Sequence, residues 1–176
     1  MKRYLLIGAA AAALAVPAGA FAAGTPSANS LAVQACKTQQ AQIGAATFKA
    51  TYGANAYGKC VSKATHAAAA NLQNSAEACK AEQALAPADF SAAHGGKTFD
   101  AFYGANAKGK SADANAYGKC VSLKAKATAL QQTQATVAAA KACKAELAAS
   151  KTAFATAYGS KANAFGKCVA KKSTAK

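Results

Sequence analysis

Residues 55–62 read NAYGKCVS, residues 115–122 read NAYGKCVS again, and residues 163–170 read NAFGKCVA. Each octet opens with an asparagine whose side-chain oxygen can cap a helix, at Asn55, Asn115 and Asn163. In the first octet, apolar residues continue at helical spacing and predict one inward stripe, formed by Tyr57, Cys60, Val61 and Ala64. A glycine in the first turn, such as Gly58, also lets another backbone approach closely. The octet is therefore predicted to begin a helix and to carry a cysteine on its buried face.

The octet is the last motif of a sequence unit that occurs three times. Each unit begins with Ala-Cys-Lys, at 35–37, 78–80 and 142–144, and the second and third units add Glu82 and Glu146. Next comes Phe-x-x-x-Tyr-Gly, at 48–53, 99–104 and 154–159. Phenylalanine and tyrosine four residues apart share one helix face and are predicted to be core, and the glycine is predicted to end the helix. We expect units at residues 30–73, 74–130 and 131–170.

The composition predicts an all-α fold of three disulfide-stapled helical repeats. About a third of the chain is alanine, the best helix former, and clusters of β-branched or aromatic residues typical of strands are missing. Residues 121–149 are nearly all Ala, Lys, Gln and Leu and predict one long helix joining units two and three. Asn74 and Glu77 predict the start of the helix that carries Cys79, and Pro87 predicts its end.

The cysteines indicate a disulfide framework, because an exported chain with an even count at repeating positions is typical of one. Six cysteines allow 15 pairings. Unit two contains two insertions, PADFSAAHGGK at 87–97 and AKGKSADA at 107–114, and both lie between Cys79 and Cys120. Because a longer loop adds little to the entropy cost of closing it, length variation between two cysteines favours their pairing within the unit. In unit three an unbroken helix would hold the first cysteine too far from the last, so this pairing requires a bend near Ser150. The favoured pairs are Cys36 with Cys60, Cys79 with Cys120, and Cys143 with Cys168.

The N-terminal segment predicts export. Lys2 and Arg3 precede an apolar run and then small residues around an Ala20-Phe21-Ala22 site, as in a secretory signal peptide covering 1–22. An uncleaved membrane anchor is the alternative. We expect a mature chain starting near Ala23, with a flexible leader at 23–29 and a frayed basic tail, KKSTAK, at 171–176.

Charge is the main functional signal. Without the signal peptide the chain has 19 lysines and six acids, a net charge of +13, and Arg3 is the single arginine of the full sequence. Lysine is a hydrated point charge without the planar fork that reads bases or phosphates in a bidentate way. The composition thus indicates diffuse attraction to polyanions and argues against sequence-specific nucleic-acid recognition. The alternative is that the lysines only solvate Ala-rich helices.

Three chemical motifs are present only in outline. Residues 53–60, GANAYGKC, imitate a phosphate-binding loop, but no strand is predicted before them. The cysteines form no Cys-x-x-Cys pair, and His66 and His94 fall outside the repeated positions, which argues against zinc or haem. The six acids lie singly among lysines and alanines, which favours caps or ion pairs over acid-base catalysis. We expect no catalytic, cofactor-binding or metal-binding residue.

The Asn-Ala-Tyr/Phe-Gly-Lys-Cys-Val motif and the Ala-Cys-Lys-Ala-Glu stretches at 78–82 and 142–146 resemble repeats of small, uncharacterised exported proteins of high-GC Gram-positive bacteria. This resemblance covers roughly residues 35–170 and implies an exported bacterial repeat protein, but no activity. Two functions are considered, of which the first is favoured and the second is the alternative. The first is a non-enzymatic secreted or envelope protein that binds anionic cell-wall polymers, extracellular DNA or an anionic lipid surface. The second is a small disulfide-rich effector or inhibitor that binds one protein partner through the insertions of unit two.

Overall fold

The computed structural model describes residues 26–104 and 115–174, and within these ranges the chain is all α-helical, as predicted. No strand occurs in the described ranges. The helices are α1 (Ala28–Tyr52), α2 (Ala56–Gln83), α3 (Pro87–Ala93), α4 (Phe99–Gly104), α5 (Ala116–Ala149), α6 (Lys151–Tyr158) and α7 (Ala164–Thr174). The predicted signal peptide, the Ala23 start and the 107–114 insertion lie outside the described residues.

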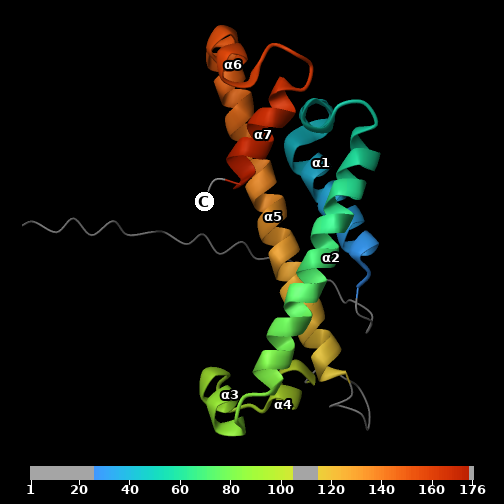
Figure 1. The fold of residues 1–176 in the computed structure, drawn as a ribbon, viewed down its shortest axis with the longest axis vertical. Coiled ribbons are helices and arrows are strands. Elements are labelled where there is room, and N and C mark those ends of the chain that lie inside the picture. Colours follow the sequence, from blue (N-terminus) through green and yellow to red (C-terminus); the bar gives the residue numbers. More distant parts are fainter. Residues whose placement is uncertain (1–25, 105–114, 175–176) are drawn as a thin grey trace, which may run out of the picture.

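The molecule is an elongated helical rod built along α5 (Figure 1). Helix α2 runs beside α5 in the opposite direction, and α1 packs against both in the upper half of the view. Helices α3 and α4 lie at the lower end, whereas α6 and α7 lie at the upper end. The expected unit boundaries at 73/74 and 130/131 fall inside α2 and α5, so each of these helices contributes to two units.

Three disulfides join the pairs that the sequence favours. Cys36 is bonded to Cys60, Cys79 to Cys120, and Cys143 to Cys168, each with its Cα atoms 6.0 Å apart. All six cysteines are fully buried and contribute to small, separate clusters rather than to one large core. Each bond closes a chain loop of 24 to 41 residues and contributes about 3 to 4 kcal/mol in the loop-entropy account.

Bends allow the first cysteine of units one and three to reach the second. The predicted bend at Ser150 is confirmed: its backbone is extended (φ −158°, ψ 109°), ends α5, and lets the side-chain oxygen accept a hydrogen bond from Ala153 N at the start of α6. Unit one has a bend that the sequence analysis missed, at Gly44, where φ is +77° inside α1. Both bends lie seven or eight residues after the first cysteine, so the Phe-x-x-x-Tyr helix folds back over the disulfide.

Two of the three asparagines at the octet starts do not act as predicted. Asn55 and Asn115 precede α2 and α5 in the left-handed region (φ 52° and 76°), and neither side chain makes a capping hydrogen bond. A Cβ added at Gly58 or Gly118 would lie within about 3 Å of the amide group of the asparagine three residues earlier. The glycine therefore leaves room for the asparagine side chain.

The close backbone approach allowed by the octet glycine occurs at Gly166. A Cβ added there would lie 2.6 Å from the carbonyl oxygen of Thr51, at the end of α1. The prediction that Tyr57 belongs to the inward stripe is wrong, because its side chain is exposed. Cys60 is buried, and Val61 and Ala64 pack beside it as predicted, together with Ala56 in place of the tyrosine.

Several predicted helix limits are wrong. Helix α2 runs through Asn74 and Glu77 without a break and ends at Gln83, while Pro87 begins α3, a position where its missing N–H is tolerated. The expected leader is already helical from Ala28, capped by Ser27. The expected tail is helical through Thr174, since α7 packs its apolar face on α5 and brings its lysines along.

Candidate functional site

A polar cluster of the same composition pattern contacts each of the three disulfides. The third residue after the first cysteine presents an oxygen 3.9 Å from a sulfur of the disulfide, a contact without a hydrogen bond because that sulfur carries no hydrogen. The tyrosine of Phe-x-x-x-Tyr donates its hydroxyl hydrogen to the same oxygen, at 2.6, 2.8 and 3.2 Å in units one, two and three. The acceptors are Gln39, Glu82 and Glu146, and the donors are Tyr52, Tyr103 and Tyr158.

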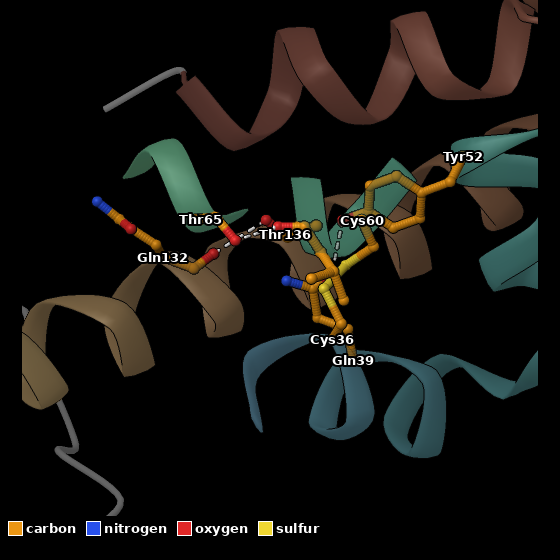
Figure 2. Close-up of a disulfide and its surroundings, with 8 residues drawn as sticks. Cys36, Gln39, Tyr52, Cys60, Thr65, Gln132 and Thr136 are labelled. Atoms are coloured by element: carbon orange, nitrogen blue, oxygen red, sulfur yellow. Dashed lines mark hydrogen bonds between the residues drawn. A yellow bond between two sulfur atoms is a disulfide. The ribbon is translucent and has the colours of Figure 1, made fainter. Parts of the chain in front are cut away.

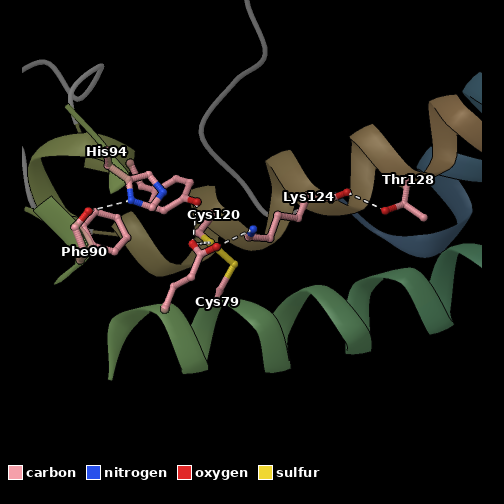
Figure 3. Close-up of polar contacts among 8 residues, drawn as sticks. Cys79, Phe90, His94, Cys120, Lys124 and Thr128 are labelled. Carbon is pink, nitrogen blue, oxygen red and sulfur yellow. Dashed lines mark hydrogen bonds and ion pairs between the residues drawn. A yellow bond between two sulfur atoms is a disulfide. The ribbon is translucent and has the colours of Figure 1, made fainter. Parts of the chain in front are cut away.

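In units two and three the carboxylate also pairs with a lysine. Lys124 Nζ lies 2.7 Å from Glu82 Oε1, and Lys172 Nζ lies 2.7 Å from Glu146 Oε1. Both lysines come four residues after the second cysteine, one helical turn beyond the disulfide, as Figure 3 shows for Lys124 beside Cys120. Unit one has Ala64 at that position and a neutral amide, Gln39, as the acceptor. The acid and its lysine are thus present together or absent together.

These contacts shift the proton affinities. Burial alone would raise the pKa of Glu82, but the hydrogen bonds from Lys124 and Tyr103 lower it below its usual value. Burial, together with the hydrogen bond to Glu82, raises the pKa of Tyr103 to about 12. The hydrogen bond from Lys172 lowers the pKa of Glu146. Each shift moves away from neutral pH, so the clusters hold their protons in place there instead of exchanging them.

The clusters are therefore structural. They tie the tyrosine helix, both cysteine-bearing helices and the disulfide of each unit into one arrangement. The two glutamates were recognised as part of the repeat from the sequence, but their common role and the equivalent position of Gln39 were not predicted. The signal was present, because all three acceptors lie three residues after the first cysteine of a unit.

The lysines gather in one half of the rod. A small central cluster of Leu31, Ala68 and Ala125 marks the division, and we call residues 32–67 and 126–174 the upper half, after their place in Figure 1. The upper half carries 12 lysines and one acid, Glu146, a net charge of +11. The described residues of 69–124, the lower half, carry four lysines and four acids, a net charge of zero; residues 105–114, outside the described ranges, add two lysines and one aspartate by sequence.

Most upper-half lysines are exposed. Only Lys126 and Lys172 are half-buried, and Lys172 pairs with Glu146. The ten exposed ones are Lys37, Lys49, Lys59, Lys63, Lys141, Lys144, Lys151, Lys161, Lys167 and Lys171. The sequence count of +13 gave no hint of this separation, because it arises from the folding of unit three back onto unit one.

The lower half has a different surface. Of the large apolar side chains that are exposed in the described ranges, four belong to it: Leu85, Phe102, Tyr117 and Leu123. Phe102 borders an aromatic cluster in which Phe90 stacks on His94, with ring centroids 3.9 Å apart (Figure 3). His94 Nδ1 donates to the carbonyl oxygen of Phe90 at 2.9 Å. The first insertion of unit two, residues 87–97, thus contributes two stacked rings to an aromatic cluster.

A cavity of about 530 Å³ lies between α1, α2, α5 and α7. Alanines, threonines and amides form most of its wall, and it reaches the disulfide of unit one at Cys60. Figure 2 shows Gln39 and Tyr52 beside this disulfide, with Gln132 and Thr136 of α5 nearby. Within the part of the chain that the structure describes, Lys63 is the one charged residue of its lining.

The phosphate-loop imitation at residues 53–60 consists of a turn at 53–55, with Gly53 at φ +81°, followed by the start of α2. A phosphate-binding loop needs a preceding strand, and α1 occupies that place. Among the described residues, no group of three His, Cys, Asp or Glu side chains could hold a metal ion. Over the same ranges, no helix combines the length and apolarity needed to cross a membrane.

Comparison of the chain with protein-family models, with curated proteins and with solved structures finds no match. The proposed function therefore rests on the sequence and on the charge distribution and exposed surfaces of the structure.

Proposed function

We propose that this is a non-enzymatic, exported protein whose upper half binds anionic polymers or surfaces electrostatically. The observation that carries the proposal is the concentration of charge, +11 in the upper half against zero in the described lower half. A field from one end of a rod attracts a polyanion more strongly than the same charge spread evenly, because fewer of its charges are screened from the ligand by distance. Teichoic acid, extracellular DNA and anionic lipid head groups all fit this chemistry.

The alternative that the lysines only solvate the helices predicts a different surface. Solvating charge is usually mixed in sign and interspersed, as in the lower half. In the upper half, ten exposed lysines face a single acid, which is already paired with Lys172. Such a field destabilises the rod by self-repulsion, so its presence is better accounted for by a partner of opposite charge.

A salt titration with matched variants tests the proposal. Two exposed lysines of α5, Lys141 and Lys144, are replaced by glutamine; the control replaces Lys80 and Lys97 of the lower half. Both variants lose two charges. The slope of log K against log salt for duplex DNA should fall by up to about 1.8 in the upper-half variant, about 0.9 per phosphate contact, and should hardly change in the control. For teichoic acid and anionic vesicles, too, the salt dependence of binding should fall more in the upper-half variant than in the control.

Two results would count against this proposal. Equal effects of the two variants would mean that total charge, and not its position, sets the affinity. If no polyanion binds detectably at low salt, the electrostatic function is refuted.

A second candidate function is the effector or inhibitor that binds one protein partner. The exposed apolar side chains of the lower half, beside a net charge of zero, favour it, because apolar and aromatic groups without like-charge repulsion suit a protein interface. Its binding would resist salt and would fail on Phe102→Ala with Leu123→Ala, whereas polyanion binding would be unaffected by that double substitution. Recovery of one salt-resistant partner from the cell envelope would favour this function.

Export is part of the proposal. Three disulfides fit an oxidising compartment, and the predicted signal peptide and the resemblance to exported Cys-repeat proteins support secretion to the envelope or beyond. Intact-mass measurement of secreted protein should find a chain starting at or near Ala23, and peptide mapping without reduction should find the three disulfides within units. A retained Met1 in the membrane fraction would instead indicate an anchored protein.

A further inference from the structure

We propose that the cavity between α1, α2, α5 and α7 binds one anionic amphiphile, with its apolar chain inside and its acidic head group at Lys63. The volume of about 530 Å³ falls in the range of small-molecule sites, roughly 300 to 1,000 Å³. The apolar part of the wall is made mainly of short side chains, among them Leu31, Ala35, Ala64, Ala129 and Val169. Short side chains on four helices leave a space that residues 26–104 and 115–174 do not fill.

Many polar groups of the wall already have partners. Tyr52 donates to Gln39 at 2.6 Å, and the amides of Asn71 and Gln132 exchange two hydrogen bonds at 3.0 and 3.1 Å. The lining threonines Thr51, Thr128 and Thr136 donate to carbonyl oxygens of their own helices. A sugar or other polyhydroxyl ligand needs free donors and acceptors for most of its own groups. A hydrocarbon chain needs none, so the wall favours an apolar ligand body.

Charge selects the head group. Among the described residues of the lining, Lys63 is the single charged one, and its exposure places it at the mouth of the cavity. The half of the rod around it carries +11, so a cationic head group would be repelled and an anionic one attracted. Both the charge and the apolar wall therefore point to one ligand class, a single-chain carboxylate or a similar anionic amphiphile.

Calorimetric titration of the oxidised protein with dodecanoate and with its methyl ester, both below their aggregation limits, tests the proposal. We expect one site per chain. Lys63→Gln should weaken dodecanoate binding by up to about fivefold, the range of an exposed charge pair, and leave the ester unaffected. Lys37→Gln, which removes another exposed charge outside the cavity lining, should change neither affinity.

A second pair of variants tests the location. Ala129→Phe places a ring into the cavity and should weaken both ligands by about tenfold or more, because a well-filled site tolerates no added volume. Ala138→Phe makes the same change at an exposed position of α5 outside the lining and should leave binding intact. Polyanion binding should be the same in Ala129→Phe as in the natural chain, which keeps this test separate from that of the proposed function.

Three outcomes would overturn the inference. They are the absence of saturable binding by the folded chain, equal effects of Lys63→Gln on acid and ester, and unchanged affinity in a folded Ala129→Phe variant. Tighter binding of an N-acetylated sugar than of dodecanoate would assign the cavity to a polar ligand instead.

Discussion

Transferring the ion pair of units two and three into unit one tests the repeated cluster directly. The acceptor above the disulfide is Glu82 or Glu146 where a lysine lies four residues after the second cysteine, and Gln39 where that position is Ala64. We expect Gln39→Glu alone to destabilise the protein and the double change Gln39→Glu with Ala64→Lys to recover most of the loss.

The magnitude follows from the burial of the site. Gln39 is 6% exposed, whereas the side chain of Glu82 is 23% exposed and has Lys124 at 2.7 Å. A carboxylate at position 39 would keep the hydrogen bond from Tyr52 but would lack a cation, which costs about 1 to 3 kcal/mol. A lysine at position 64 supplies the cation at the equivalent place, and pairs in contact couple by about 0.5 to 3 kcal/mol.

Urea unfolding of the oxidised protein at pH 7 and pH 3.5 gives the assay, each variant being compared with the natural chain at the same pH. Without a cation, burial should raise the folded-state pKa of a glutamate at position 39 above its unfolded value of about 4.3. A raised folded pKa means that the carboxyl is tolerated while protonated at low pH and becomes destabilising as pH rises through that pKa. The loss in Gln39→Glu should therefore be present at pH 7 and largely gone at pH 3.5.

Unit two provides the reverse control. Lys124→Ala alone should destabilise more than the double change Glu82→Gln with Lys124→Ala, because the single change leaves the carboxylate without its cation. If Gln39→Glu has no effect at pH 7, or if adding Ala64→Lys recovers nothing, then the joint presence of acid and lysine is unrelated to charge pairing.

Two further predictions concern packing and alkaline stability. Gly166→Ala should lower the free energy of unfolding by about 1 to 3 kcal/mol, because its Cβ would lie 2.6 Å from the Thr51 carbonyl oxygen. In the control Gly58→Ala the new Cβ meets only the Asn55 side chain, which can rotate, so the effect should be smaller. Equal shifts of the thermal unfolding midpoint in the two variants would contradict this prediction. Burial and Glu82 raise the pKa of Tyr103 from 10.0 to about 12, so its stabilising effect is complete below pH 10 and is lost as pH rises through 12. Urea unfolding should show the difference between the natural chain and Tyr103→Phe shrinking across that window, and a constant difference would refute the assignment.

Local properties of the chain were predictable from sequence. Alanine content and the absence of strand-forming clusters determine helix, since these preferences act residue by residue. The octet repeat and the insertions between Cys79 and Cys120 were enough to favour pairing within units, because loop length constrains which cysteines can meet. The need for a bend at Ser150 followed from the 1.5 Å rise of a helix and the short reach of a disulfide.

Helix limits and caps were predicted poorly. A capping signal at Asn74 was overridden because α2 is joined to α5 on both sides of it, by the Asn71–Gln132 hydrogen bonds and the Cys79–Cys120 disulfide. Such packing outweighs a local propensity of about 1 kcal/mol. At Asn55 and Asn115 the residue type was informative, but the backbone is left-handed, and the side chain lies beside Gly58 or Gly118 in the first helical turn without making a capping hydrogen bond.

The sequence by itself determined that this chain is helical, strongly basic and stapled by three disulfides, because composition, charge and cysteine spacing are properties that no folding can alter. Only the tertiary structure decided where the charge goes and where space is left. Helix α5 carries unit three back beside unit one, so their lysines add up at one end while the acids of unit two stay at the other. The cavity exists for the same reason: α1, α2, α5 and α7 come from distant parts of the chain, and the volume between their short side chains depends on how they cross, which spacing along one helix does not specify.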